Sequence, residues 1–157
     1  MNDKDYDSAS ALSTDWSLLI ERKLDWSELD QLGHANNARY FTWFEEARMA
    51  YFERVGIPTD DQRGWGPILA QTECQFLAPV PWPSRLIIGA RVTRIGNSSF
   101  TMEYTAHRKS EDNSQSISCV AKGSGVVVLI KYATGEKVRV NDEIRAEINS
   151  LDKLFSV

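Results

Sequence analysis

The sequence Asp30-Gln-Leu-Gly-His-Ala-Asn-Asn37 stands directly before the longest helical pattern in this chain. It offers a carboxylate in Asp30, a glycine turn at Gly33 and two asparagines that suit the first positions of a helix. The start of a helix exposes unpaired backbone N–H groups and a positive dipole potential. A carboxylate beside such donors can attack, or direct water at, a carbonyl whose oxygen the donors hold. The pattern therefore indicates acyl-transfer chemistry, here hydrolysis, without a serine or cysteine nucleophile.

The helical pattern that follows runs from Asn36 or Asn37 to Val55. Gly56 and Pro58 form a normal stop signal after it. Apolar residues at spacings of four and three predict one buried stripe, made by Tyr40, Phe44, Ala47, Tyr51 and Val55 and widened by Phe41, Met49 and Phe52. So many aromatic residues favour a helix that is wrapped by a sheet rather than one lying on a surface.

The remaining pattern is mostly that of strands, predicted at residues 16–26, 65–77, 85–95, 100–108 and 116–132. A short strand is expected after the turn at 133–136, and a terminal helix after Asn141 or Asp142, with Ile144, Ile148, Leu151 and Phe155 on one side. The glycines at 123 and 125 suggest a bulge or a close backbone approach. No strand–helix–strand alternation is present, so the sequence predicts an α+β protein with an antiparallel sheet.

The bulk composition sets broad limits. The 157 residues fit one domain at 16–157 after a frayed polar leader at 1–15. A net charge of -4 gives no drive toward nucleic acid or anionic membranes, and the longest apolar run, Val126–Ile130, is too short to span a bilayer. A signal peptide pattern is not visible, which favours a cytoplasmic location. Cys74 and Cys119 match no metal spacing and are expected to be reduced core thiols.

The motif Asp-x-x-Gly-His-x-Asn-Asn-x-x-Tyr, which begins at Asp30, and the Glu-Glu-Ala-Arg run that begins at Glu45 resemble a known family. They are similar to the 4-hydroxybenzoyl-CoA thioesterase group of hotdog-fold acyl-CoA thioesterases. The resemblance implies a sheet curled around one long central helix. It also implies a homodimer, or a homotetramer built as a dimer of dimers, with each active site between two subunits.

The resemblance also implies roles for individual residues. Asp30 corresponds to the catalytic carboxylate, as a nucleophile or as a general base on water. The backbone N–H of Asn37 corresponds to the donor that polarises the thioester carbonyl, while Gly33 and His34 shape the loop and Tyr40 lines the substrate site. Only two histidines are present, so a histidine-based metal centre is not expected.

The coenzyme A site is less complete than the catalytic motif. In the 4-hydroxybenzoyl enzyme, a turn rich in arginine and lysine binds the coenzyme A phosphates, whereas the turn here is Gly96-Asn-Ser-Ser-Phe100. Ser98 and Ser99 could bind pantetheine or phosphate, and Arg91 and Arg94 just upstream could replace the basic turn.

The sequence therefore predicts an acyl-CoA thioesterase that releases free coenzyme A and a carboxylic acid, without a separate cofactor or metal. One alternative is a hotdog module that binds acyl-CoA without catalysis. Another is a thioesterase acting on acyl-carrier protein, which would call for a basic patch including Arg85, Arg91 and Arg94. The Glu45 and Arg48 spacing of i, i+3 predicts a surface ion pair on the helix.

Overall fold

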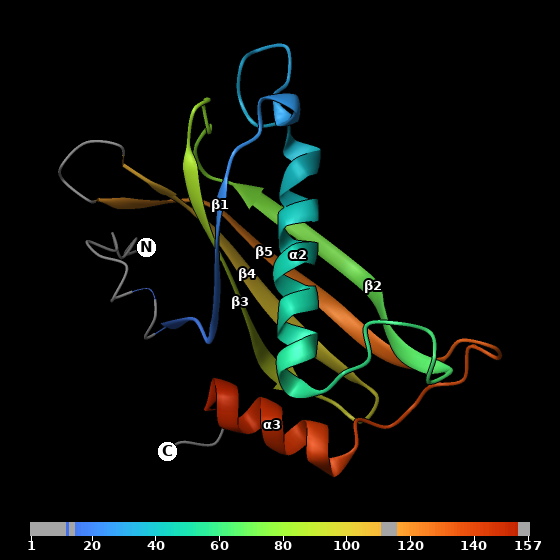
Figure 1. The fold of residues 1–157 in the computed structure, drawn as a ribbon. Helices are drawn as coiled ribbons and strands as arrows, with labels where there is room; N and C mark the ends of the chain where they lie inside the picture. The colour runs from blue at the N-terminus through green and yellow to red at the C-terminus, as the bar shows by residue number, and fades with distance from the viewer. Residues whose placement is uncertain (1–11, 13–14, 111–115, 154–157) are drawn as a thin grey trace.

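The computed structural model describes residue 12 and residues 15–110 and 116–153 (Figure 1). In chain order its elements are β1 (Leu18–Lys23), the 3₁₀-helix η1 (Trp26–Glu28), α2 (Asn37–Val55), β2 (Trp65–Phe76), β3 (Arg85–Ile95), β4 (Ser99–Lys109), β5 (Ile117–Lys131) and α3 (Asp142–Asp152). None of the helices in these ranges is both long and apolar enough to cross a membrane.

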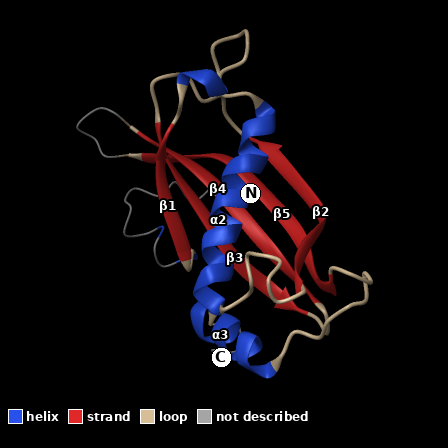
Figure 2. Cartoon of the chain, turned by 45° about the vertical axis from the view of Figure 1, so that its right-hand side comes forward, coloured by secondary structure: helices blue, strands red, loops and turns tan. Residues whose placement is uncertain are grey.

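The five strands form one antiparallel sheet in the order β1-β3-β4-β5-β2. Figure 2 shows α2 lying across one face of this sheet, with α3 near the end where α2 finishes. This arrangement confirms the predicted α+β class, with an antiparallel sheet around one long helix. The 12-residue strand β2 forms one edge of the sheet and pairs, within the described residues, only with β5.

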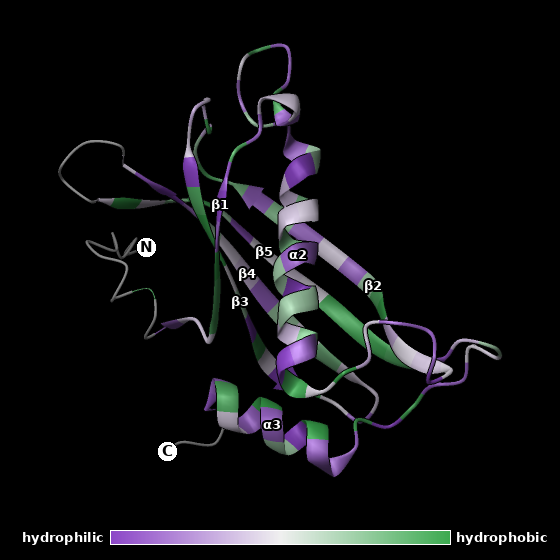
Figure 3. Ribbon diagram, in the orientation of Figure 1, coloured by the Kyte–Doolittle hydropathy of each residue, from purple (hydrophilic) through white to green (hydrophobic). Residues whose placement is uncertain are grey.

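The core lies between α2 and the sheet. All five residues of the predicted helical stripe are buried, and so are Trp43 and Phe52. Apolar and polar residues alternate along α2 in Figure 3, as expected of a helix with one buried face. Phe44 approaches β5 so closely that a Cβ on Gly123 would lie 2.5 Å from its ring. The predicted close backbone approach at Gly123 is therefore confirmed.

The first strand is shorter than the sequence predicted. β1 ends at Lys23 instead of Trp26, because the side chain of Asp25 caps η1 and accepts a hydrogen bond from the Ser27 N–H. Glu28 completes this capping box by accepting from the backbone N–H of Asp25.

The other elements keep close to their predicted bounds. The chain after β5 makes an isolated bridge between Ile130 and Lys137 rather than the short strand that was expected. Asn141 caps α3, as predicted. Phe155 and most of the predicted leader lie outside the described residues, but Leu12 is fully buried beside Ile87, which differs from a frayed leader at that residue.

The predicted surface ion pair between Glu45 and Arg48 is wrong. Arg48 is only 6% exposed, and its guanidinium donates a hydrogen bond to the Tyr104 hydroxyl at 3.3 Å. The neighbouring Glu46 pairs instead with Arg22 of β1. Arg48 lies one turn after Phe44 on the same buried face, which carries it toward the sheet and away from Glu45.

Candidate active site

The loop between η1 and α2 is closed by its own backbone. Asp30 donates its N–H to the His34 carbonyl at 2.8 Å, and the Gly33 N–H donates back to the Asp30 carbonyl at 3.1 Å. Gly33 has a φ of 78°, a left-handed conformation that glycine adopts without strain. The Ala35 N–H ties the loop to the Val80 carbonyl, which precedes β3.

The Asp30 carboxylate is half-buried and oriented by this loop. Its Oδ1 accepts hydrogen bonds from the backbone N–H groups of Leu32 at 2.8 Å and His34 at 3.3 Å. Its Oδ2 has no hydrogen-bond partner among the described residues. One oxygen of the carboxylate is thus held by the backbone while the other remains available.

The start of α2 leaves one amide unused beside this carboxylate. Asn36 is the N-cap, and its side chain accepts from the Ala38 N–H at 2.9 Å while its carbonyl accepts from Arg39. The backbone N–H of Asn37, the first helical residue, donates to no group within the parts of the chain that the structure describes. This is the amide to which the family resemblance assigns the role of oxyanion donor.

Asp30 and Asn37 open onto one cleft of about 370 Å³. It is lined by Asp30, His34, Ala35, Asn37, Tyr40, Phe76, Leu77, Ala78 and Pro79. Tyr40 forms its buried base, with its ring centroid 5.1 Å from that of Phe76 at the end of β2. Burial, with a smaller contribution from the Cys74 sulfur, raises the pKa of Tyr40 to about 12, so its hydroxyl stays neutral at physiological pH. The cleft combines a polar mouth with an apolar wall.

The structure does not bring the expected coenzyme A residues to this cleft. Ser98 and Ser99 lie at the turn between β3 and β4, where Phe100 packs edge-on against Phe52 near the end of α2. The start of α2 and Phe52 are separated by a rise of roughly 22 Å along the helix axis. Within one chain, these serines therefore belong to the opposite end of the sheet.

Arg91 and Arg94 differ in how they are engaged. Arg91 forms an ion pair with Glu103 at 2.7 Å and lies over the Trp16 ring. Arg94 is exposed, and no described residue pairs with it. Arg85 begins β3 near the cleft and lies roughly 30 Å along the strand from Arg94. The basic patch expected for a carrier-protein thioesterase is thus not assembled from these three residues in one chain.

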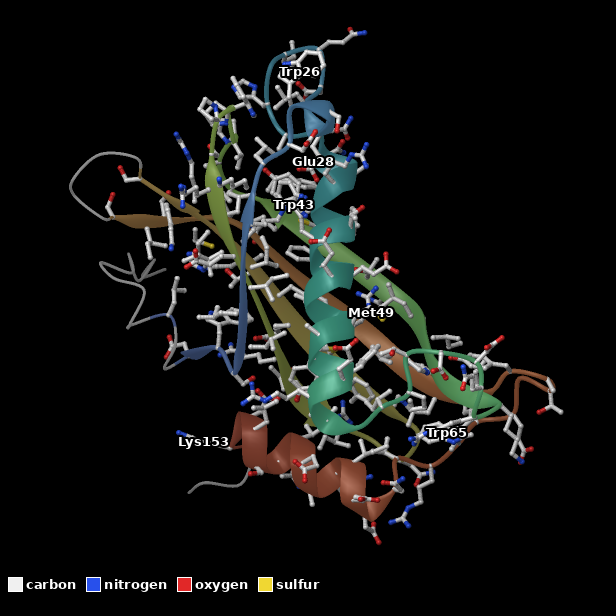
Figure 4. All side chains as sticks on the ribbon, in the orientation of Figure 1. Trp26, Glu28, Trp43, Met49, Trp65 and Lys153 are labelled. Carbon is white, nitrogen blue, oxygen red and sulfur yellow. The ribbon has the colours of Figure 1, made fainter. Side chains whose placement is uncertain are left out.

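One buried residue beside the cleft was missed by the sequence analysis. Glu28 is 8% exposed, and its carboxylate accepts from Arg22, from Trp43 Nε1 at 2.9 Å and from the Asp25 N–H at 2.9 Å. Figure 4 shows Glu28 next to Trp43 at the start of α2. The Asp25-x-x-Glu28 spacing of a capping box was the available signal in the sequence.

A second hollow, of about 900 Å³, lies on the other face of the sheet and includes Thr105, His107 and Cys119. Both cysteines are free but only half-buried, which differs from the buried core thiols that the sequence predicted. Within the described ranges, no three His, Cys, Asp or Glu side chains come together in an arrangement that could hold a metal ion. The Asp30 cleft brings together the Asp30 carboxylate, the Asn37 amide and the apolar side chains of Phe76 and Leu77.

The family is shown by comparison with known proteins. Residues 24–148 match the model of the thioesterase-like superfamily, which covers most of the chain. This chain belongs to the thioesterase-like superfamily. The matched span contains the whole Asp30 loop, α2 and all strands after β1.

Individual relatives agree with this membership. A thioesterase-superfamily crystal structure from Jannaschia sp. CCS1 superposes with a TM-score of 0.84 at 25% identity, over 94% of this chain and 92% of that one. A Thermus thermophilus thioesterase, solved with coenzyme A and zinc, gives a TM-score of 0.71 at 28% identity over 88% and 96%. An Arabidopsis thaliana chloroplast acyl-acyl carrier protein thioesterase is 30% identical over 82% of this chain and 65% of its own length.

Proposed function

We propose that this protein hydrolyses an acyl-CoA thioester to free coenzyme A and a carboxylic acid at the Asp30 cleft. The observation that carries the proposal is the meeting of the Asp30 carboxylate and the unused Asn37 N–H on one opening. The Asn37 N–H would donate a hydrogen bond to the oxygen of a thioester carbonyl bound there. The Asp30 carboxylate could then attack the carbonyl carbon or activate a water molecule. The apolar side chains of Tyr40, Phe76 and Leu77 suit the acyl group.

Two routes are consistent with this arrangement. In the nucleophilic route, Asp30 Oδ2 bonds to the carbonyl carbon, the C–S bond breaks, and water then hydrolyses the mixed anhydride. In the general-base route, Oδ2 takes a proton from water, the hydroxide adds to the carbonyl, and the thiolate leaves and receives the proton. Hydroxylamine also cleaves thioesters directly, but only the anhydride route can leave a hydroxamate on the Asp30 peptide, so that product separates the two routes.

The proposal includes a homodimer joined through the open edge of β2. Antiparallel pairing of two β2 strands about a twofold axis would bring the β3–β4 turn end of one subunit to the Asp30 end of the other. Ser98, Ser99 and the exposed Arg94 would then face the partner's cleft. In this way the residues expected to bind coenzyme A would serve the Asp30 site of the second subunit.

A carrier-protein substrate is the second candidate, favoured by the plant acyl-acyl carrier protein relative. The two substrates share the pantetheine thioester and differ in what carries it. To distinguish the two substrates, kcat/KM should be measured for the same acyl group carried by coenzyme A, by a carrier protein and by pantetheine alone. A rate on carrier protein well above that on coenzyme A would reassign the substrate while keeping the chemistry.

The test of the catalytic assignment is Asp30→Asn, assayed by thiol release over short, long and aromatic acyl-CoAs. We expect kcat to fall by roughly 10²–10⁴, because a positioned acid–base or nucleophilic group is lost. Circular dichroism and the unfolding midpoint should stay close to those of the parent protein, since the amide oxygen can still accept from Leu32 and His34. Unchanged turnover would refute Asp30 as the catalyst, and acyl-CoA binding without any product would favour the non-catalytic module.

A further inference from the structure

The carboxylate of Glu28 joins three elements in one buried network. Its Oε1 accepts from Arg22 of β1 at 2.7 Å and from Trp43 of α2 at 2.9 Å. Its Oε2 accepts from Arg22 at 2.9 Å and from the Asp25 N–H at 2.9 Å. These four contacts engage both oxygens of a side chain that has almost no access to water. The carboxylate is therefore fully engaged, although Arg22 Nε is buried and has no partner among the described residues, and a buried network of this kind favours one local geometry.

The backbone of Glu28 also closes the loop that carries the proposed site. Its carbonyl oxygen accepts from the Asn36 N–H at 2.8 Å, and Leu29 forms a bridge with Ala35 directly afterwards. The loop is therefore closed between Glu28 at its start and Asn36 at its end. Asp30 is two residues beyond one side of this closure, and Asn37 is one residue beyond the other.

We propose that Glu28 is a positioning residue that sets the distance between the Asp30 carboxylate and the Asn37 N–H. The proposal rests on the function assigned to that cleft. Glu28 itself does not line the cleft, so it acts through the loop and the helix start. Catalysis by a preorganised carboxylate and amide is sensitive to displacements of about 1 Å, which can lower turnover by roughly 10²-fold.

The charge of Glu28 is not its main contribution. Arg22 also pairs with Glu46 at 2.8 Å and lies over the Trp43 ring, so it keeps a partner when Glu28 is neutral. A glutamine in place of Glu28 has one acceptor oxygen and one NH₂ group. It cannot accept from both Trp43 and Asp25 in the present geometry, so one of these two contacts must be lost.

The test compares Glu28→Gln with two matched variants. Asp152→Asn changes a carboxylate that accepts from Val92, Tyr51 and Ser17 near the other end of α2. Glu46→Gln removes the charge of the exposed partner of Arg22 and leaves the Glu28 contacts in place. We expect Glu28→Gln to lower kcat at least tenfold with KM changed by less than about threefold, and both controls to keep kcat within about twofold.

Hydrogen exchange supplies a readout that does not depend on activity. In Glu28→Gln, the Leu32, His34 and Asn36 amides should exchange at least tenfold faster than in the parent, because their acceptors belong to the loop. The same amides should keep their parental rates in Asp152→Asn. A Trp43→Phe variant keeps an aromatic side chain, smaller than the indole, but loses the Nε1 donor, and its effect on kcat should be less than additive with Glu28→Gln.

The outcomes separate this inference from the proposed function. A hydrolytically inactive parent protein would refute the function, while faster loop exchange in Glu28→Gln would still support the anchoring role. An active parent whose Glu28→Gln variant loses no more kcat than Asp152→Asn at equal thermal stability would overturn the positioning role alone. A proportional rise in KM would also overturn it, because that result indicates weakened substrate binding instead of a displaced carboxylate.

Discussion

His107 illustrates how a single buried group ties stability to pH. Its Nε2 lies 2.7 Å from the Thr105 hydroxyl, beside Ile87 on the neighbouring strand. Burial, followed by the positive charge of Lys122, lowers its pKa from 6.5 to about 4. The folded protein therefore holds His107 neutral at pH values where the unfolded chain already protonates it.

We predict a loss of stability on mild acidification that His107 causes. Between pH 6.5 and 4 the unfolded state binds a proton that the folded state does not, so this contribution is complete above pH 6.5 and declines as the pH falls. The shift corresponds to about 2 kcal/mol between pH 7 and pH 5. Urea unfolding at both pH values measures it, and in His107→Gln the decrease should be smaller by about that amount. An equal decrease in both proteins would contradict this role.

At the scale of elements, local signals located α2 well and η1 poorly. The apolar stripe, the asparagine cap and the Gly56 stop all act within a few residues, so α2 could be bounded from the sequence. The end of β1 was placed three residues too late, because the Asp25-x-x-Glu28 capping-box spacing that starts η1 was not recognised in the sequence.

The two helices offer a matched comparison of their N-caps. Asn36 accepts from the Ala38 N–H at 2.9 Å, and Asn141 accepts from the Ile144 N–H at 2.8 Å. We expect Asn36→Ala and Asn141→Ala each to lower the free energy of unfolding by about 1 kcal/mol. Only Asn36→Ala should lower kcat, by roughly tenfold, because only this cap orders the amide next to Asp30. Urea unfolding and thiol-release assays measure both quantities. Equal kcat values in the two variants would contradict a role of the Asn36 cap in the reaction.

At the scale of the whole molecule, the exposed edge of β2 is the surface that we expect to bind another subunit. Four large apolar residues on or just after this strand are 39–45% exposed: Ile68, Leu69, Phe76 and Leu77. A long edge strand with exposed apolar side chains invites pairing with another chain. This is why the proposed dimer uses β2 and not the six-residue strand β1 at the other edge.

We expect the protein to behave in solution as a dimer, or a dimer of dimers, of the 17.8 kDa chain. Leu69→Lys places a charge in the middle of the β2 edge, and a twofold interface would contain it twice. Light scattering should then report a 17.8 kDa monomer with reduced turnover. Thr93→Lys, at an exposed position of the interior strand β3, should keep the parental mass. A monomeric parent protein that is fully active would refute the shared site.

The α+β class and the bounds of α2 could be predicted from local sequence patterns. So could the Asp30–Tyr40 part of the cleft, because its residues lie within eleven positions of one another and are held by short-range backbone bonds. Tertiary packing was needed to bring residues 76–79 into the cleft, to join Glu28 to Trp43 and Arg48 to Tyr104, and to place Ser98 far from Asp30. Those features depend on which strand lies beside which helix, and long-range packing of this kind leaves no local pattern in the chain.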